Sequence, residues 1–258
     1  MTERHVTIVT GASQGIGRAI ATEFGKDGDV VVLAARNVAG LEETASEVET
    51  AGGSPMVVET DVTSQSSVAA MVESVTTAYG RIDVLVNNSG IGGPSGALWE
   101  VDPAEWRSTF DVNVFGVFLV SRAVLPVMVS QGAGSVVVIG SISGKRPLHG
   151  RSSYSASKTA LIGLTRTLAL EAGSLGIRVN LISPGFVAGP RLDWVMEAQA
   201  ESRGIGVDEV KKEFEAQAAL GRLTEPVDVA QTAVFLASDE AEAITGADIN
   251  VNSGVVMY

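Results

Sequence analysis

The feature that most constrains the fold is an alternation along the chain, in which apolar runs of strand length are separated by stretches with helical spacing. The apolar runs are HVTIVT, VVVLAA, PMVVET, IDVLVNN, SVVVIGS, IRVNLIS and ADINVN. Because these runs are continuously apolar, helices are expected to cover both faces of the sheet that they form. The pattern predicts an α/β fold built on a doubly wound parallel sheet of about seven strands.

Length and composition predict one domain over residues 1–258, since 258 residues with 45% hydrophobic content can bury a single substantial core. One segment, 189–224, departs from the alternation. It is rich in Glu, Ala, Gln and Lys, and Val207, Val210, Phe214 and Ala218 stand at helical spacing within it. We expect one or two helices that form a lid over a substrate pocket, although a plain surface pair of helices fits the same pattern.

Composition also excludes several classes of function. Without cysteine the chain has no disulfide or thiolate metal site, and two histidines, His5 and His149, give little material for a metal site or a serine–histidine triad. No metal is expected. The net charge of −12 argues against nucleic acid as a partner and favours small molecules. The first residues lack a leader pattern, and no run approaches the roughly 18 apolar residues of a membrane span, so a cytoplasmic protein away from membranes is expected.

A glycine-rich turn follows the first predicted strand, where TGASQGIG leads into a helical pattern. Gly11 permits a sharp turn, Gly15 lets backbone approach a ligand, and Gly17 allows close packing of helix on sheet. The free amides of the helix start would face a pyrophosphate. A turn without any ligand uses the same residues, but the position at the first strand–helix junction favours a dinucleotide site.

A second motif places a phenol and an ammonium group on one helix face, because Tyr154 and Lys158 are four positions apart. A free tyrosine has a pKa of about 10 and is a poor base. A cation about 4 Å away is worth ~4 kcal/mol at an effective dielectric constant near 20, which would make the phenol much more acidic. A packed tyrosine beside a solvated lysine would give the same spacing.

Further motifs resemble the compact branch of the short-chain dehydrogenase/reductase family over nearly the whole chain. They are the TGxxxGxG pattern, NNSG at residues 87–90, DVNVFG, IGSISG, YSASK, SPGFVAGP and LGRLTEPVDVA. Ser141 precedes Tyr154 by thirteen residues, which fits the spacing of the family's catalytic serine and tyrosine. The resemblance implies a Rossmann fold and an alcohol dehydrogenase or carbonyl reductase, with 3-oxoacyl-thioester reduction as one common activity of such relatives.

The resemblance also implies the catalytic roles. Tyr154 would be the general acid in reduction and the general base in oxidation, with Lys158 as its activating charge. Ser141 would bind the substrate oxygen, and Ser143 is a less well spaced rival for that role. Asn113 would hold a water of a proton relay, although a side chain bonded only to backbone is its simpler interpretation.

Cofactor choice depends on VVLAARN at the end of the second strand. Ala35 stands where NAD-preferring relatives have aspartate, and Arg36 suits a ribose 2′-phosphate, so NADP is expected and NAD is the alternative. Gln14 stands where many NADP-preferring relatives have a second basic residue. The residues expected to contact the cofactor are Gly11, Ser13, Gln14, Gly15, Ile16, Gly17, Arg36, Asp61, Val62, Asn88, Ser89, Gly90, Tyr154, Lys158, Ile182, Pro184, Gly185 and Val187.

The substrate pocket is expected among the loops after the fourth, fifth and sixth strands. Its expected lining is Gly92, Trp99, Ser143, Leu148, His149, Phe186 and Trp194. A basic group near it, namely Lys145, Arg146, His149, Arg151 and Arg191, would suit an anionic substrate such as an acyl-carrier thioester, a carboxylate or a sulfonate. Exposed loops are also often basic without binding an anion. Gly189 replaces the threonine that relatives use to bond the nicotinamide carboxamide.

Two other functions fit parts of the pattern. A nucleotide-binding sensor or scaffold would keep the fold without catalysis, but it would not need the complete set of proton-transfer residues. A sugar-nucleotide epimerase or dehydratase is disfavoured by the short chain and the glycine spacing. The resemblance further implies a homotetramer, and the small-residue face SASKTALIGLTRTLA would allow a partner helix to pack closely.

Overall fold

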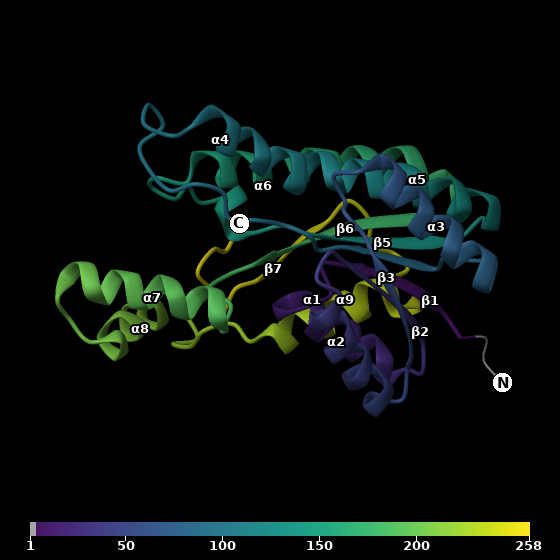
Figure 1. Cartoon of the computed structure of the whole chain (residues 1–258), viewed down its shortest axis with the longest axis horizontal. Helices are drawn as coiled ribbons and strands as arrows, with labels where there is room; N and C mark the ends of the chain where they lie inside the picture. The colour runs from purple at the N-terminus through teal and green to yellow at the C-terminus, as the bar shows by residue number, and fades with distance from the viewer. Residues whose placement is uncertain (1–3) are drawn as a thin grey trace.

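A computed structural model describes residues 4–258 of the chain. Its core is one sheet of seven parallel strands in the order β3-β2-β1-β4-β5-β6-β7. The strands are β1 (Val6–Thr10), β2 (Val30–Ala35), β3 (Ser54–Glu59), β4 (Val84–Asn87), β5 (Gly134–Ile139), β6 (Ile177–Pro184) and β7 (Asp248–Val251). The predicted doubly wound parallel sheet is confirmed (Figure 1).

Helices cover both faces of this sheet (Figure 1). One face carries α1 (Gly15–Lys26), α2 (Val38–Ala51) and α9 (Pro226–Ala237), and the other carries α3 (Gln65–Tyr79), α5 (Gly116–Gln131) and α6 (Ser152–Ala172). Successive residues of a strand enter different cores: Val136 and Val138 of β5 belong to one, and Val137 and Ile139 to the other. The apolar runs are continuous because each strand face is buried.

The segment between β4 and β5 is one long helical run with an irregular centre. It consists of α4 (Pro103–Phe110), the π-helical turn η1 (Asp111–Phe115) and α5. Asp102 starts the run, since its carboxylate accepts hydrogen bonds from the backbone N–H groups of Ala104 and Glu105 at 2.8 and 3.1 Å. The π-helical turn carries Asn113, whose side chain is buried.

The same run, Pro103–Gln131, is the one helix within residues 4–258 that is long and apolar enough to cross a membrane, with 44% of its most apolar window buried. A core helix meets the same criteria. Here Val120, Val124 and Met128 pack into the core with strand residues of the sheet. Length and composition of this run are therefore weak evidence for a membrane span.

The segment after β6 leaves the sheet and forms two helices, α7 (Pro190–Arg203) and α8 (Val207–Ala216), beside the main body (Figure 1). Met196, Ala200 and Val210 give this pair a small core of its own. Its two ends meet in a bridge between Val187 and Thr224. The predicted helices in 189–224 are present, and the short helices η2 (Ile142–Gly144), η3 (Gly173–Leu175) and η4 (Asp239–Ala241) complete the described elements.

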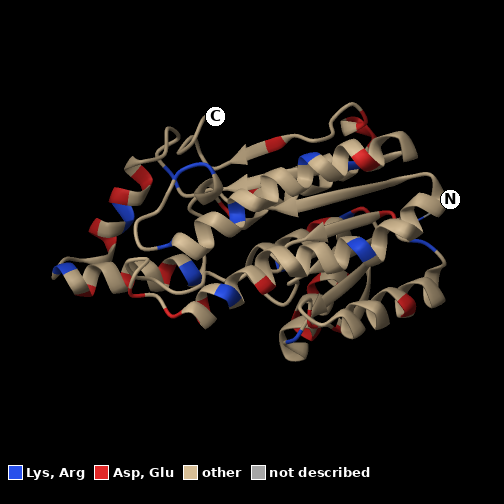
Figure 2. Ribbon diagram, turned by 90° about the horizontal axis from the view of Figure 1, so that it is seen from above, with Lys and Arg blue, Asp and Glu red and all other residues tan. Residues whose placement is uncertain are grey.

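Acidic and basic residues are interspersed over the helices in the view of Figure 2. The net charge of −12 is therefore spread out in this view and does not gather on one helix. Such a distribution gives a phosphate backbone no extended positive stripe on this side.

Candidate active site

The carboxyl ends of β1 and β4 are joined where the strand order changes direction, which is the place where doubly wound sheets bind ligands. The Thr10 hydroxyl accepts hydrogen bonds from the backbone N–H groups of Asn88 and Ser89 at 3.0 and 3.1 Å. The Asn88 amide donates in return to the carbonyls of Thr10 and Gly11 at 2.9 and 3.2 Å. The NNSG segment thus fixes the position of the glycine-rich turn.

The glycine-rich turn has the geometry that its sequence predicts. Gly11 and Gly15 adopt positive φ values of 65° and 57°, and a Cβ atom on Gly17 would collide with the Gly11 carbonyl oxygen. Helix α1 starts at Gly15, and the Gln14 side chain makes no capping hydrogen bond. The first backbone N–H groups of α1 are consequently left for a ligand, and a pyrophosphate fits this cradle.

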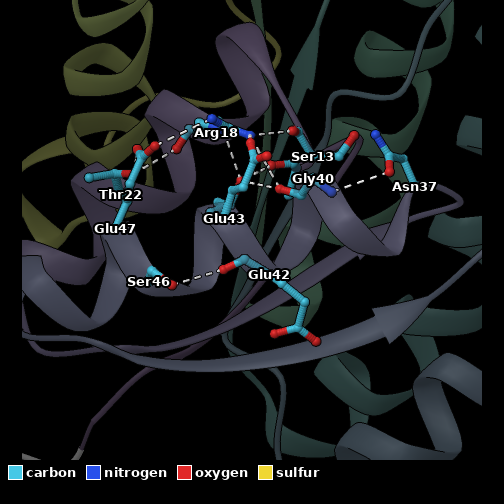
Figure 3. Close-up of polar contacts among 11 residues, drawn as sticks. Ser13, Arg18, Thr22, Asn37, Gly40, Glu42, Glu43, Ser46 and Glu47 are labelled. Carbon is cyan, nitrogen blue, oxygen red and sulfur yellow. Dashed lines mark hydrogen bonds and ion pairs between the residues drawn. The ribbon is translucent and has the colours of Figure 1, made fainter.

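Arg18 holds this turn against α2, a role that the sequence analysis missed (Figure 3). Its Nη2 donates to the Ser13 carbonyl at 2.9 Å and to the Gly40 carbonyl at 3.3 Å. Glu43 and Glu47 lie 2.7 and 3.4 Å from the guanidinium group. The i, i+4 spacing of the two glutamates was the available signal, but only the packing of α1 on α2 shows which cation they meet.

Arg36 lies exposed just after β2, and among residues 4–258 it makes no hydrogen bond or ion pair. Asp61 lies near it at the end of β3. The Asp61 carboxylate accepts hydrogen bonds from the Thr63 N–H at 2.9 Å and the Thr63 hydroxyl at 2.8 Å. These bonds hold the pKa of Asp61 below its usual value, and the charge of Arg36 adds a smaller effect. Arg36 is thus a free cation beside the cradle.

Tyr154 and Lys158 share one face of α6, as their spacing predicts. Lys158 is buried, its Nζ lies 5.9 Å from the centre of the Tyr154 ring, and it donates to the Ile139 carbonyl at 2.8 Å. The Ser141 hydroxyl hydrogen-bonds the Tyr154 phenol. Ser141 also accepts from the backbone N–H of Ser143 at 3.1 Å, which fixes its orientation at the start of η2.

The surrounding charges make the phenol acidic. Burial by itself raises the pKa of Tyr154, but Lys158, Arg191, the hydrogen bond from Ser141 and Arg151 together outweigh it, and the pKa lies below its usual value. Burial lowers the pKa of Lys158, although the Tyr154 phenolate opposes that change. Two of the charges that act on Tyr154, Arg151 and Arg191, were not expected to lie so close to it.

Asn113 lies beside this pair, in the π-helical turn. Its Oδ1 accepts from the Ile91 N–H at 2.8 Å, and its Nδ2 donates to the Ile91 carbonyl at 2.9 Å and to Ser157 Oγ at 3.0 Å. A Cβ atom on Gly90 would lie 3.3 Å from Asn113 Oδ1 and 3.6 Å from Lys158 Nζ. The bonds to backbone expected from the simpler interpretation are present, and the relay role remains a prediction.

The residues expected around the nicotinamide follow β6. The Gly185 N–H donates to the Val251 carbonyl at 3.0 Å, and a Cβ atom on Gly185 would lie 2.7 Å from that of Asn252. Gly189 has a φ of 133°, a backbone conformation that residues with side chains rarely adopt. The threonine common in relatives would therefore be strained at position 189.

The expected apolar wall of the substrate pocket is largely open. Trp99 is 86% exposed and Trp194 66%, while Leu148 and His149 are also exposed. Phe186 packs edge-on against Phe214 of α8, with 4.7 Å between ring centres. The Gly92 carbonyl accepts a hydrogen bond from Arg151, whose guanidinium group lies near the Tyr154 ring. The Ser143 N–H donates to the hydroxyl of Ser141, which in turn contacts Tyr154. Which of these residues line the pocket stays a prediction.

Comparison with known proteins supports the architecture and the family. A family model described as "Enoyl-(Acyl carrier protein) reductase" matches residues 11–256. The 3-oxoacyl-(acyl-carrier-protein) reductase FabG of Staphylococcus aureus is 35% identical over 254 residues, which cover 97% of each chain.

Two solved structures are similarly close. Actinorhodin polyketide ketoreductase with NADPH superposes with a TM-score of 0.92 at 35% identity, over 99% of this chain and 98% of that one. NAD+-bound xylitol dehydrogenase gives a TM-score of 0.91 at 29% identity, over 97% and 98% of the two chains. The chain belongs to the short-chain dehydrogenase/reductase family, and it is an oxidoreductase of the alcohol dehydrogenase and carbonyl reductase type.

Proposed function

We propose that the chain is an NADP(H)-dependent oxidoreductase that interconverts a ketone and a secondary alcohol with Tyr154 as general acid and base. The surroundings of Tyr154 carry the proposal: Ser141 hydrogen-bonds its phenol and Lys158 Nζ lies 5.9 Å from its ring centre, and both hold its pKa below the usual value. A phenol that changes protonation nearer neutral pH is the group that this proton transfer requires.

The residues divide the work between them. A bound nicotinamide dinucleotide supplies or accepts the hydride. In reduction, Tyr154 gives its proton to the substrate oxygen, which the Ser141 hydroxyl holds and stabilises as negative charge develops. Lys158 favours the phenolate that remains. Asn113 holds the Ile91 backbone beside Lys158, where a water could pass the replacement proton.

Support for NADP comes from Arg36. It is exposed, uncommitted within residues 4–258 and close enough to Asp61 to influence its pKa, and a guanidinium group suits the 2′-phosphate. The similarity to an NADPH-bound ketoreductase agrees with this choice, whereas the xylitol dehydrogenase neighbour binds NAD+. The relatives' names make a 3-oxoacyl thioester the first substrate to test.

A spectrophotometric panel tests the proposal directly. The protein is mixed with NADPH or NADH and with ketones, aldehydes and 3-oxoacyl thioesters, and the loss of cofactor absorbance is followed. Turnover with NADPH in preference to NADH is expected. A preference for NADH would contradict the assignment of Arg36, and no turnover with either cofactor would favour a nucleotide-binding sensor or scaffold.

We further expect a cytoplasmic homotetramer. Phe115 and Phe118 of the α4–α5 run stack on each other at 5.6 Å while 48% and 44% exposed, and Leu170 of α6 is 86% exposed. Apolar side chains left outside on the two long helices suit a partner copy. Size-exclusion chromatography with light scattering tests the tetramer, and a monomer would contradict it.

A further inference from the structure

The basic group near the active site separates into committed and uncommitted side chains. Lys145 is almost buried and lies 3.0 Å from the Asp248 carboxylate, and it also donates to Asn250 at 2.8 Å. Arg146 donates to Gln217, at the end of α8, at 3.2 Å. The charged groups of Lys145 and Arg146 are therefore bonded away from Tyr154. The guanidinium groups of Arg151 and Arg191 lie next to it.

Arg151 and Arg191 converge on one point although they come from different elements. Arg151 immediately precedes α6, and Arg191 lies in the first turn of α7. Their guanidinium carbons are 5.7 and 5.4 Å from the centre of the Tyr154 ring. A Cβ atom on Gly92 would lie 2.6 Å from an Nη2 atom of each arginine, so those two nitrogens are separated by no more than twice that distance.

No acid compensates this pair of charges within the described residues 4–258. Arg151 Nη2 donates to the Gly92 carbonyl at 2.7 Å, but its Nε is buried without a partner. Burial lowers the pKa of Arg151, and the charge of Arg191 lowers it further. Two guanidinium groups that close repel each other and are costly to hold in a partly buried place without an anion.

We propose that Arg151 and Arg191 bind an anionic group of the carbonyl substrate itself, a carboxylate, a sulfonate or a phosphate monoester, placed a few bonds from the reacting ketone. This rests on the proposed function, since it identifies the substrate class of the same site. Guanidinium forks match the oxygens of such groups in paired hydrogen bonds.

The position of the pair decides between substrate classes. Both arginines lie over Tyr154, the expected proton donor, so the anion that they bind is close to the carbon that is reduced. The ketone of a 3-oxoacyl thioester has no charge on its neighbouring atoms. A small keto acid, keto sulfonate or keto phosphate carries its charge there. Gly92, which has no side chain, lets the two guanidinium groups approach each other over its Cα.

The test compares charged and neutral versions of one ketone. The ratio of kcat/KM for acetoacetate over methyl acetoacetate is measured with NADPH, and likewise for acetonylsulfonate over its methyl ester and for dihydroxyacetone phosphate over dihydroxyacetone. At least one pair is expected to favour the anion in the parent protein. In the R151Q/R191Q variant that ratio should fall about 10- to 100-fold, since it loses hydrogen bonds to a charged group.

Arg146→Gln is the matched control, because Arg146 lies in the same loop as Arg151 but bonds to Gln217. The ratio of kcat/KM for charged over neutral ketone in this variant should match that of the parent protein. Should the double variant fold poorly, Arg191→Gln alone is read in the same way. Equal losses for charged and neutral ketones would mean that the arginines act only on the Tyr154 proton. A raised KM for NADPH with an unchanged ratio would mean that they hold the cofactor. Either outcome overturns the proposal.

Calorimetry separates this proposal from the proposed function. Butanoate, propanesulfonate and glycerol phosphate are titrated into the NADPH-loaded protein, with butyramide and glycerol as neutral controls. Binding of one anion that R151Q/R191Q abolishes would support the anion site even if no ketone were reduced. Absence of anion binding together with a preference for neutral ketones would overturn the site and leave the reductase standing.

Discussion

Two regions at the carboxyl edge of the sheet treat their arginines in opposite ways. Beside the glycine-rich turn, Arg18 is bonded to two backbone carbonyls and faces Glu43 and Glu47. Beside Tyr154, Arg151 and Arg191 meet each other and no acid within residues 4–258. Arg18 is therefore fully paired without a ligand, whereas Arg151 and Arg191 are not. The difference separates an arginine that supports structure from a pair of arginines that remain available to a ligand.

The largest expected effect comes from the centre of the uncompensated region. Tyr154→Phe removes the proton donor but keeps the ring on which both arginines lie, so kcat should fall about 10²- to 10⁴-fold. Steady-state kinetics with the best ketone measures it. Tyr79→Phe, at the half-exposed end of α3, is the control and should match the parent. Undiminished turnover by the Tyr154 variant would end the proposed mechanism.

A large change in pH dependence should follow from Lys158→Met. In alcohol oxidation the base must be deprotonated, so activity rises with pH through the pKa of Tyr154, which Lys158 holds below its usual value. Without that charge the rise should move about one to three pH units toward alkali. The pH profile of kcat for oxidation measures the shift. Lys212→Met, on exposed α8, is the control, and a profile unchanged in both variants would contradict Lys158 as the activating charge.

Arg36→Ala tests whether the unpaired cation beside the glycine-rich turn selects the cofactor. Because Arg36 is expected to bind the 2′-phosphate, the ratio of kcat/KM for NADPH over NADH should fall about 10- to 100-fold. Arg4→Ala removes an exposed arginine that bonds to Ser54 and should leave the ratio as it is. The same ratio in the Arg36 variant and the parent would show that another group selects the cofactor.

The smallest effect is expected from Arg18→Ala, which removes the arginine that is paired without a ligand. Loss of the bonds to Ser13 and Gly40 should lower the free energy of unfolding by about 1–2 kcal/mol, or Tm by a few degrees, and weaken NADPH binding severalfold. Thermal melts with and without NADPH measure both. Lys26→Ala breaks an exposed pair with Glu23 and should change Tm little. An equal change in both variants would remove the structural role given to Arg18.

Sequence predicted the sheet well because local patterns dictate it. Each apolar run became a strand within two residues of its expected bounds. The pairing of Tyr154 with Lys158 was also predictable, since both lie on one helix face. In these cases the information is contained in a few neighbouring residues.

The remaining site features depend on tertiary packing. The π-helical turn around Asn113 is stabilised by contacts with Ile91 and Ser157, which lie 22 and 44 residues away. Five basic side chains looked equivalent in the sequence, and only the structure commits Lys145 to Asp248 while it leads Arg191 to Tyr154. The direction in which α7 leaves Gly189 decides that outcome, and no local pattern encodes it.

The bridge between Val187 and Thr224 has a consequence for how new specificities can arise. Because the α7–α8 segment departs and returns at adjacent positions, its ends are held together whatever its length. Lengthening such an excursion costs little closure entropy, and the strands beneath are not displaced. The α7–α8 segment can therefore be exchanged as a unit. Transplanting it between related enzymes should transfer substrate selectivity, while the residues that serve hydride transfer stay in place.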